Sequence, residues 1–137
     1  MKSNTLKAWS IGLLILLLFA VLGEAVVAFH DYTFGRIGIA KNTILYILWV
    51  LPLAAAFIAT YMAESKKIIV GLSYLVLFPL LAALIHYLHG ELGGTVDFGG
   101  VKGAVFVFKL YFYIGSALTI LGTILGLLLS KSKEKQQ

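Results

Sequence analysis

The stretch AWSIGLLILLLFAVLGEAVVAF, from Ala8 to Phe29, decides the fold, because its only ionisable side chain is Glu24. About 20 consecutive apolar residues are enough for a helix to cross the hydrocarbon core of a bilayer. Three further stretches have the same character: Thr43 to Ala63, Ile68 to Tyr87 and Ala104 to Leu129. The sequence therefore predicts an all-α integral membrane protein, a single domain over residues 1–137 with four transmembrane helices in an antiparallel bundle.

The composition of the chain supports the same class. Hydrophobic residues make up 61% of it and charged residues 12%, whereas ordinary soluble domains are about 45–50% apolar and about 25% charged. The absence of cysteine excludes a disulfide framework, a thiolate metal site and a cysteine nucleophile. The formal net charge of +5 comes from basic residues that flank the apolar stretches, which favours a role in membrane orientation over binding to nucleic acid.

Basic residues are divided unequally between the two sides of the predicted bundle. One side has Lys2, Lys7, Lys66, Lys67, Lys131, Lys133 and Lys135, and the other has Arg36, Lys41 and Lys102. By the positive-inside rule both termini are predicted to lie in the cytoplasm. We expect the protein in the cytoplasmic membrane of a prokaryote.

The beginning of the chain also has features of a secretory signal peptide. Lys2 and Lys7 precede an apolar run, and small residues before position 29 permit cleavage after Ala28. We expect instead that this segment is retained as the first membrane span.

Two ionisable residues, Glu24 and Lys109, fall inside predicted spans. An ionised side chain at the centre of a spanning helix costs about 2.5 to 3.5 kcal/mol, so such residues usually face the bundle interior and find a partner. Counting from the middle of each span, both lie roughly 8 to 11 Å outside the midplane. The sequence predicts that they pair across the first and fourth helices. Glu24 as a proton- or cation-binding group and snorkelling of Lys109 to the headgroups are the alternatives.

The faces of these two helices favour close packing. A stripe of mostly small residues, Gly12, Leu16, Ala20, Glu24 and Ala28, follows every fourth position of the first helix. In the fourth helix, one arc of about 120° contains Lys109, Tyr113, Ser116, Thr119 and Thr123, and Gly122 and Gly126 form a GxxxG step beside it. This pattern predicts one polar, small face and one lipid face.

Prolines occur near the centres of the second and third spans. The stretch PLAAAFI begins at Pro52 and the similar stretch PLLAALI at Pro79, in helices predicted to run in opposite directions. Paired interruptions near the midplane mark substrate sites in some transporters. Because proline is tolerated in membrane helices whose neighbours satisfy the freed groups, the pattern favours kinked packing helices over such a site.

Histidines are confined to the outer side of the predicted bundle. His30 ends the first span, and His86 and His89 lie one turn apart at the end of the third. With carboxylates nearby, Zn or Cu is chemically possible, and His30 with His86 is a possible pair of haem ligands. Solvated polar tips are the simpler interpretation. The glycine-rich segment Gly90 to Gly103 is expected to be a connecting loop, with a contact to lipid headgroups or to a partner as the alternative.

The stretch GEAVVAF around Glu24 and the glycine pattern of the fourth span resemble, in outline, the small multidrug resistance transporters, which have four short helices and a glutamate in the first. The resemblance covers few residues, and the outer loops and Lys109 depart from it. It favours the hypothesis of a small oligomeric transporter in which Glu24 binds a proton or cation. In that hypothesis, Pro52 and Pro79 permit rearrangement.

Three functions are consistent with these patterns. The first is an accessory, assembly or self-associating subunit of a membrane complex, because the chain has no constellation of acid, base and nucleophile and the fourth helix suits packing. The second is a small oligomeric transporter coupled to protons or cations through Glu24. The third is a membrane metal or haem protein that uses the outer histidines. The expected partners are the lipid bilayer and other membrane subunits or further copies of the chain; neither a catalytic residue nor a bound cofactor is predicted.

Overall fold

The computed structural model describes residues 3–29, 38, 41–92 and 100–134. These residues form five helices: α1 (Ser3–Phe29), α2 (Lys41–Leu48), α3 (Val50–Met62), α4 (Lys67–Glu91) and α5 (Gly100–Glu134). No strand occurs in this part of the chain. Four segments are long and apolar enough to cross a membrane: Ser3–Phe29, Thr43–Met62, Lys67–Glu91 and Gly100–Ser132. The all-helical, membrane-embedded class predicted from the sequence is therefore confirmed.

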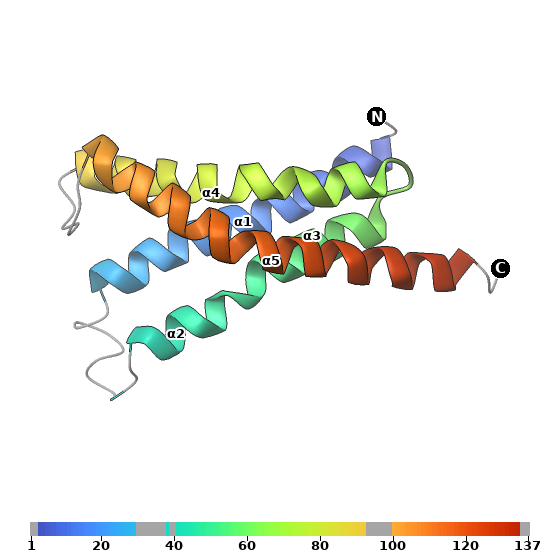
Figure 1. Ribbon diagram of the computed structural model, residues 1–137, viewed down its shortest axis with the longest axis horizontal. Coiled ribbons are helices and arrows are strands. Elements are labelled where there is room, and N and C mark those ends of the chain that lie inside the picture. The colour runs from blue at the N-terminus through green and yellow to red at the C-terminus, as the bar shows by residue number, and fades with distance from the viewer. Residues whose placement is uncertain (1–2, 30–37, 39–40, 93–99, 135–137) are drawn as a thin grey trace.

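The helices lie side by side along the long axis of the molecule (Figure 1). α1 begins, α3 passes into α4 and α5 ends at one end, which we call the terminal end; α1 and α4 end, and α2 and α5 begin, at the other, the distal end. Both α1 and α5 pack against α3 and α4. α1 and α5 consequently lie across the molecule from each other, and their mutual contact is small compared with the contacts that each makes with α3 and α4.

The two prolines have different effects on their helices. The second span is interrupted at Trp49, between α2 and α3, and Pro52 is the third residue of α3. A proline ring clashes with the carbonyl four residues earlier and provides no amide proton for it. That carbonyl belongs to Leu48, where α2 ends. Pro79 lies inside α4 without a break in the helix, and both prolines are fully buried.

The bundle is held together by small residues that let helix backbones approach closely. Gly12, Leu16 and Ala20 are buried in α1, as the four-residue stripe predicts. In α5, a Cβ atom added at Gly122 would lie 2.4 Å from the carbonyl oxygen of Leu53, and one at Gly126 would lie 2.8 Å from that of Phe57. α3 and α5 are therefore in backbone contact, which residues larger than glycine would prevent.

The polar arc predicted on α5 is split by the packing. Thr119 and Thr123 are buried, whereas Lys109 and Tyr113 are exposed, Tyr113 by 75%. One row of buried positions recurs at multiples of four residues, Gly103, Val107, Gly115, Thr119 and Thr123, and Gly122, Gly126 and Ser130 form a second row beside its end. Four residues turn an α-helix by about 400°, so the first row drifts by about 40° at each step. The predicted polar arc keeps one direction along the helix, so it coincides with the buried row near Thr119. At Lys109 the buried row has turned away from the arc, and the lysine side chain is exposed.

At the terminal end, hydrogen bonds join α1 to the turn before α4 and to α4 itself. Asn4 donates to Glu64, the backbone amide of Ser65 donates to the Thr5 hydroxyl at 3.1 Å, and Trp9 Nε1 donates to Ser73 Oγ at 3.0 Å. Lys66 closes the turn in the left-handed conformation, with φ at 53°. These contacts fix the terminal end of α1 against α4.

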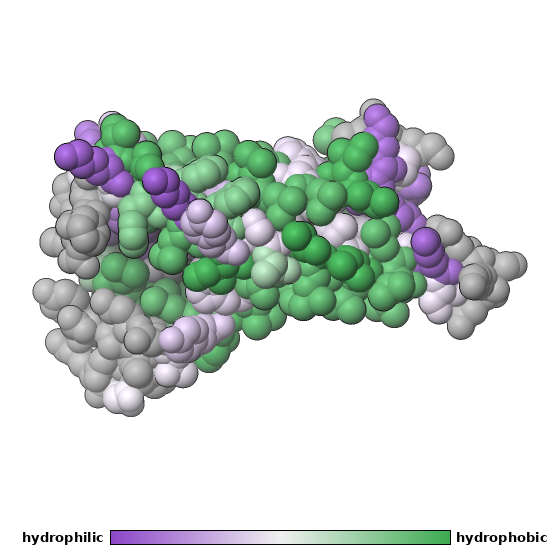
Figure 2. Space-filling model, in the orientation of Figure 1, coloured by the Kyte–Doolittle hydropathy of each residue, from purple (hydrophilic) through white to green (hydrophobic). Residues whose placement is uncertain are grey.

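The surface has the polarity that a membrane requires. Figure 2 shows hydrophobic side chains over the middle of the viewed face and hydrophilic ones gathered toward its two ends. Large apolar side chains are exposed along every helix that can cross a membrane, including Leu14, Val76 and Leu128.

Candidate functional site

Glu24 lies in the seam between α1 and α4 and is held there by two histidines. Its Oε1 atom is 2.9 Å from Nδ1 of His86, and its Oε2 atom is 2.9 Å from Nδ1 of His89. The side chains are largely shielded, with exposures of 17% for Glu24, 13% for His86 and 22% for His89. We refer to these three residues as the Glu24 cluster.

The geometry of the cluster follows from helix spacing. Residues three apart on an α-helix lie on the same face, so His86 and His89 present their rings to one side of α4. α4 continues to Glu91, beyond the Tyr87 boundary expected from the sequence, and therefore keeps His89 on the helix. A carboxylate has two oxygens and accepts one hydrogen bond on each when both imidazoles carry their proton on Nδ1. One carboxylate thus joins two turns of the neighbouring helix.

This arrangement replaces the pair that the sequence predicted between Glu24 and Lys109. Lys109 lies on the exposed surface of α5, and among the described residues nothing forms an ion pair with it. The reason is the face of α5 that meets α1: Tyr111 lies beside Gly23 of α1, and Lys109, two residues earlier, is about 200° around the helix from it and points outward. Depth along the membrane was insufficient to identify the partner, because depth does not specify which helices are neighbours.

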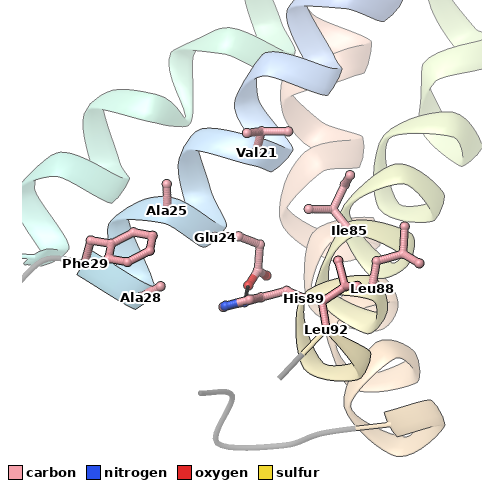
Figure 3. A pocket seen from close by; sticks show the side chains of 9 residues that line it. All are labelled: Val21, Glu24, Ala25, Ala28, Phe29, Ile85, Leu88, His89 and Leu92. Carbon is pink, nitrogen blue, oxygen red and sulfur yellow. Dashed lines mark hydrogen bonds and ion pairs between the residues drawn. The ribbon is translucent and has the colours of Figure 1, made fainter. Parts of the chain in front are cut away.

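A groove opens beside the Glu24 cluster, between α1 and α4 (Figure 3). Its volume is about 390 Å³. The lining is almost entirely apolar apart from Glu24 and His89; the residues are Val21, Glu24, Ala25, Ala28, Phe29, Ile85, Leu88, His89 and Leu92. The site therefore combines a titratable group with an apolar surface that is open to the surroundings of the bundle.

Four aromatic rings pack together in the interior of the bundle, on the side of the Glu24 cluster that faces the terminal end. Phe19, Trp49, Phe78 and Tyr111 come from the four different spans, and each ring contacts the other three, with centroid separations from 5.1 to 5.9 Å. We call them the four-ring cluster. Tyr111 also lies close enough to Glu24 to interact with it electrostatically. On its terminal-end side, the Glu24 cluster is therefore bordered by tightly packed aromatic side chains.

The threonines of α5 belong to the packing and not to this site. Thr123 donates to the carbonyl oxygen of Thr119 at 2.8 Å. The hydroxyls of Thr60 and Thr123 both flank Gly71, where an added Cβ would lie 2.4 Å from each oxygen. The hydroxyls of Thr60 and Thr119 are buried without a hydrogen-bond partner among the described residues. Ser116, also in the predicted polar face, donates to the carbonyl oxygen of Phe112.

The structure offers limited support for a metal centre. In the described ranges, no group of three or more His, Cys, Asp and Glu side chains is placed to hold a metal ion. His30 lies outside the described residues, as do Asp31 and Asp97. In the Glu24 cluster, the Nδ1 atom of each imidazole faces a carboxylate oxygen, so these ring atoms are engaged in hydrogen bonds.

The role of the histidines as partners of Glu24 was missed by sequence reasoning, although a signal was present. His86 and His89 share a helix face, and the end of the third span meets the end of the first at the same side of the membrane. A carboxylate on one helix and two imidazoles on one face of the next is a complementary pattern.

No protein family, curated protein or solved structure matches this chain. Its function is therefore inferred from its own residues and their geometry.

Proposed function

We propose that this chain is a small membrane transporter coupled to protons or cations, in which Glu24 is the ion-binding carboxylate. The observation that carries the proposal is the placement of both Glu24 oxygens at 2.9 Å from His86 and His89, beside an open groove. Ionisable residues inside membrane spans are costly, and they commonly belong to ion pathways and proton relays.

The Glu24 cluster has the chemistry to change charge without losing its hydrogen bonds. With the carboxylate ionised and both imidazoles neutral, its charge is −1; with both imidazoles protonated, its charge is +1. Nδ1 donates to the carboxylate in either state, because a neutral imidazole can carry its proton there. Proton uptake can therefore alter the electrostatics of the groove while the helix contact persists.

The proposal is tested by flux measurements on the purified protein in liposomes. A pH-sensitive dye enclosed in the liposomes reports proton movement, which is driven by a K⁺ diffusion potential. The flux is measured first without added cations and then with each of a panel of monovalent and divalent cations outside the liposomes. We expect Glu24→Gln to lower the protein-dependent flux at least tenfold, because the amide cannot carry the negative charge.

The matched control is Glu91→Gln, which removes an exposed carboxylate near the end of the same helix that carries the histidines. This variant should retain the full flux. Equal flux from the wild type and Glu24→Gln, or no flux above that of empty liposomes for any ion of the panel, contradicts the proposal.

The same proposal includes a membrane orientation. We propose an antiparallel four-helix bundle with both termini in the cytoplasm of a prokaryotic cell. Exposed lysines at the terminal end, among them Lys7, Lys66 and Lys131, support this orientation through the positive-inside rule. The Glu24 cluster and its groove then face the outer leaflet.

A second candidate is the accessory or self-associating subunit. The observation that favours it is Lys109, a cationic side chain on the exposed surface of α5 among apolar and aromatic neighbours such as Val105, Leu110 and Phe112. Charged side chains at membrane depth usually face other protein and not lipid. A chain that remains monomeric and alone when isolated from native membranes would argue against this function.

A further inference from the structure

Lys109 is an exposed charge of α5 that the Glu24 cluster does not explain. It lies nine residues after the start of α5, within the segment that can cross a membrane. The side chains around it on the surface are apolar or aromatic: Val105, Leu110, Phe112 and Tyr113 are all exposed. In the part of the chain that the structure describes, no acidic side chain pairs with Lys109.

The depth of Lys109 matches that of the groove. Tyr111 contacts the ring of Phe19 at 5.8 Å between centroids, and its hydroxyl would lie 3.8 Å from a Cβ atom at Gly23. Lys109 is two residues, about 3 Å, nearer the distal end than Tyr111. It is therefore level with the part of α1 at which the groove begins, Val21 to Ala25.

The charge of the groove is opposite to that of Lys109. When His86 and His89 are neutral, the Glu24 cluster carries one negative charge in an apolar lining. Tyr111 of α5 lies beside Gly23 and Glu24 of the same molecule, and Lys109, two residues earlier, is about 200° around the helix from it, on the exposed side. The Lys109 side chain is therefore directed away from the Glu24 cluster of its own molecule and toward the space that a second molecule can occupy.

We propose that Lys109 of one copy enters the α1–α4 groove of a second copy and completes the Glu24 site as its counter-cation. The proposal rests on the proposed role of Glu24 as a charged site, and it identifies the occupant of the groove as α5 of another copy. The cavity of about 390 Å³ is larger than one side chain, so it accommodates a lysine together with apolar atoms that flank it.

The two surfaces that meet are different, so the interface is heterologous. Both copies span the membrane at the same depth and in the same direction, so the rotation that relates them is about an axis along the membrane normal. Repetition of a head-to-tail contact about such an axis produces a closed ring when the rotation divides a full turn. Each Glu24 cluster in the ring receives one lysine from its neighbour.

Disulfide trapping tests this contact, because the chain has no cysteine of its own. One tagged copy carries Ala25→Cys, in the groove, and a differently tagged copy carries Val105→Cys, one turn from Lys109 on the exposed face of α5. After co-expression and mild oxidation of the membranes, we expect a disulfide-linked heterodimer. The control pair is Ile47→Cys with Val105→Cys, since Ile47 is exposed in the distal half of the second span but outside the groove.

The yield with Ala25→Cys should exceed that with Ile47→Cys at least fivefold. Adding Lys109→Gln to the α5 copy should lower the yield at least fivefold, whereas Lys131→Gln, an exposed lysine near the end of α5, should leave it unchanged. Equal yields for the two cysteine pairs, or no effect of Lys109→Gln, overturn the proposal. Equal yields for the two pairs would indicate that Lys109 contacts lipid headgroups or a different protein.

These outcomes are separate from the flux test of Glu24. Loss of flux in Glu24→Gln without specific trapping retains the transporter proposal and removes the intermolecular lysine. Specific trapping that depends on Lys109, in a protein whose flux is independent of Glu24, retains the contact and removes the transport function.

Discussion

The two halves of the seam between α1 and α4 differ in what holds them. In the terminal half, Gly12 admits the ring of Tyr74, whose hydroxyl donates to the carbonyl oxygen of Trp9, and the Trp9 indole donates to Ser73. In the distal half, the contact is the carboxylate of Glu24 with His86 and His89, beside an open groove. The same two helices thus have a close-packed, uncharged region and a loosely packed, titratable one.

The two halves of the seam use polar side chains for different purposes. The side chains that form hydrogen bonds between α1 and α4 in the terminal half, Trp9, Ser73 and Tyr74, are uncharged, so they are suited to holding one geometry. Those in the distal half are a carboxylate and two imidazoles beside an open groove. A substitution in the distal half of the seam should therefore act locally and leave the terminal half in place.

The largest effect on this comparison is expected from Gly12→Ala. An added Cβ would lie 2.3 Å from the Tyr74 hydroxyl, 2.7 Å from its ring carbon and 3.0 Å from the carbonyl oxygen of Ala55. Tyr74 is fully buried, so it cannot move away freely. Overpacking of this kind costs about 2 to 3 kcal/mol in the free energy of unfolding, measured by denaturant titration in detergent.

The matched control is Gly23→Ala in the distal half of the same helix. There the nearest atom to an added Cβ is the Tyr111 hydroxyl, at 3.8 Å, which is an ordinary contact. Alanine is favoured over glycine within helices, so this variant should gain up to about 1 kcal/mol. Equal destabilisation by the two substitutions would show that the halves are packed alike.

A smaller and local effect is expected from His89→Phe. This change removes one hydrogen bond to the Glu24 carboxylate, at a cost of about 1.5 to 3 kcal/mol for a bond to a charged group, offset in part by the apolar ring. Hydrogen exchange should accelerate at amides near Glu24 and not at those near Trp9. Uniform acceleration along α1 would show instead that the two halves open together.

The smallest effect is expected from Tyr74→Phe. The ring still fills its site, so the loss is limited to the hydroxyl's hydrogen bond to the Trp9 carbonyl, about 1 kcal/mol. Tyr113→Phe is the control, because that side chain is 75% exposed and should change the free energy of unfolding by less than about 0.5 kcal/mol. A loss as large as that of Gly12→Ala would indicate that the hydroxyl, and not the packing, holds the terminal half.

The membrane spans could be predicted because hydropathy and length determine them. The second span, expected over Thr43 to Ala63, is observed over Thr43–Met62, and the first reaches Phe29 as expected. The ends of α4 and α5 differ by a few residues: α4 extends through His89 to Glu91, and α5 begins at Gly100 inside the expected glycine-rich loop. Helix ends depend on local contacts that apolar periodicity does not record.

The candidate site was predictable only in part. Glu24 was identified because an intramembrane carboxylate is rare and costly. Its partners were not, because the order of helices around the bundle depends on side-chain packing, such as the contact of Gly12 with Tyr74 and that of Gly122 with Leu53. Once α4 is known to neighbour α1, the one-turn spacing of His86 and His89 is sufficient to place both beside Glu24.

The four-ring cluster has a consequence for motion within the bundle. Each of Phe19, Trp49, Phe78 and Tyr111 contacts the other three, so every span is linked directly to every other at one level. A helix that rotates there must repack its ring against three partners at once, which makes independent motion of one helix costly. Any rearrangement that starts at the Glu24 cluster, beside Tyr111, would therefore reach all four spans in a single concerted step.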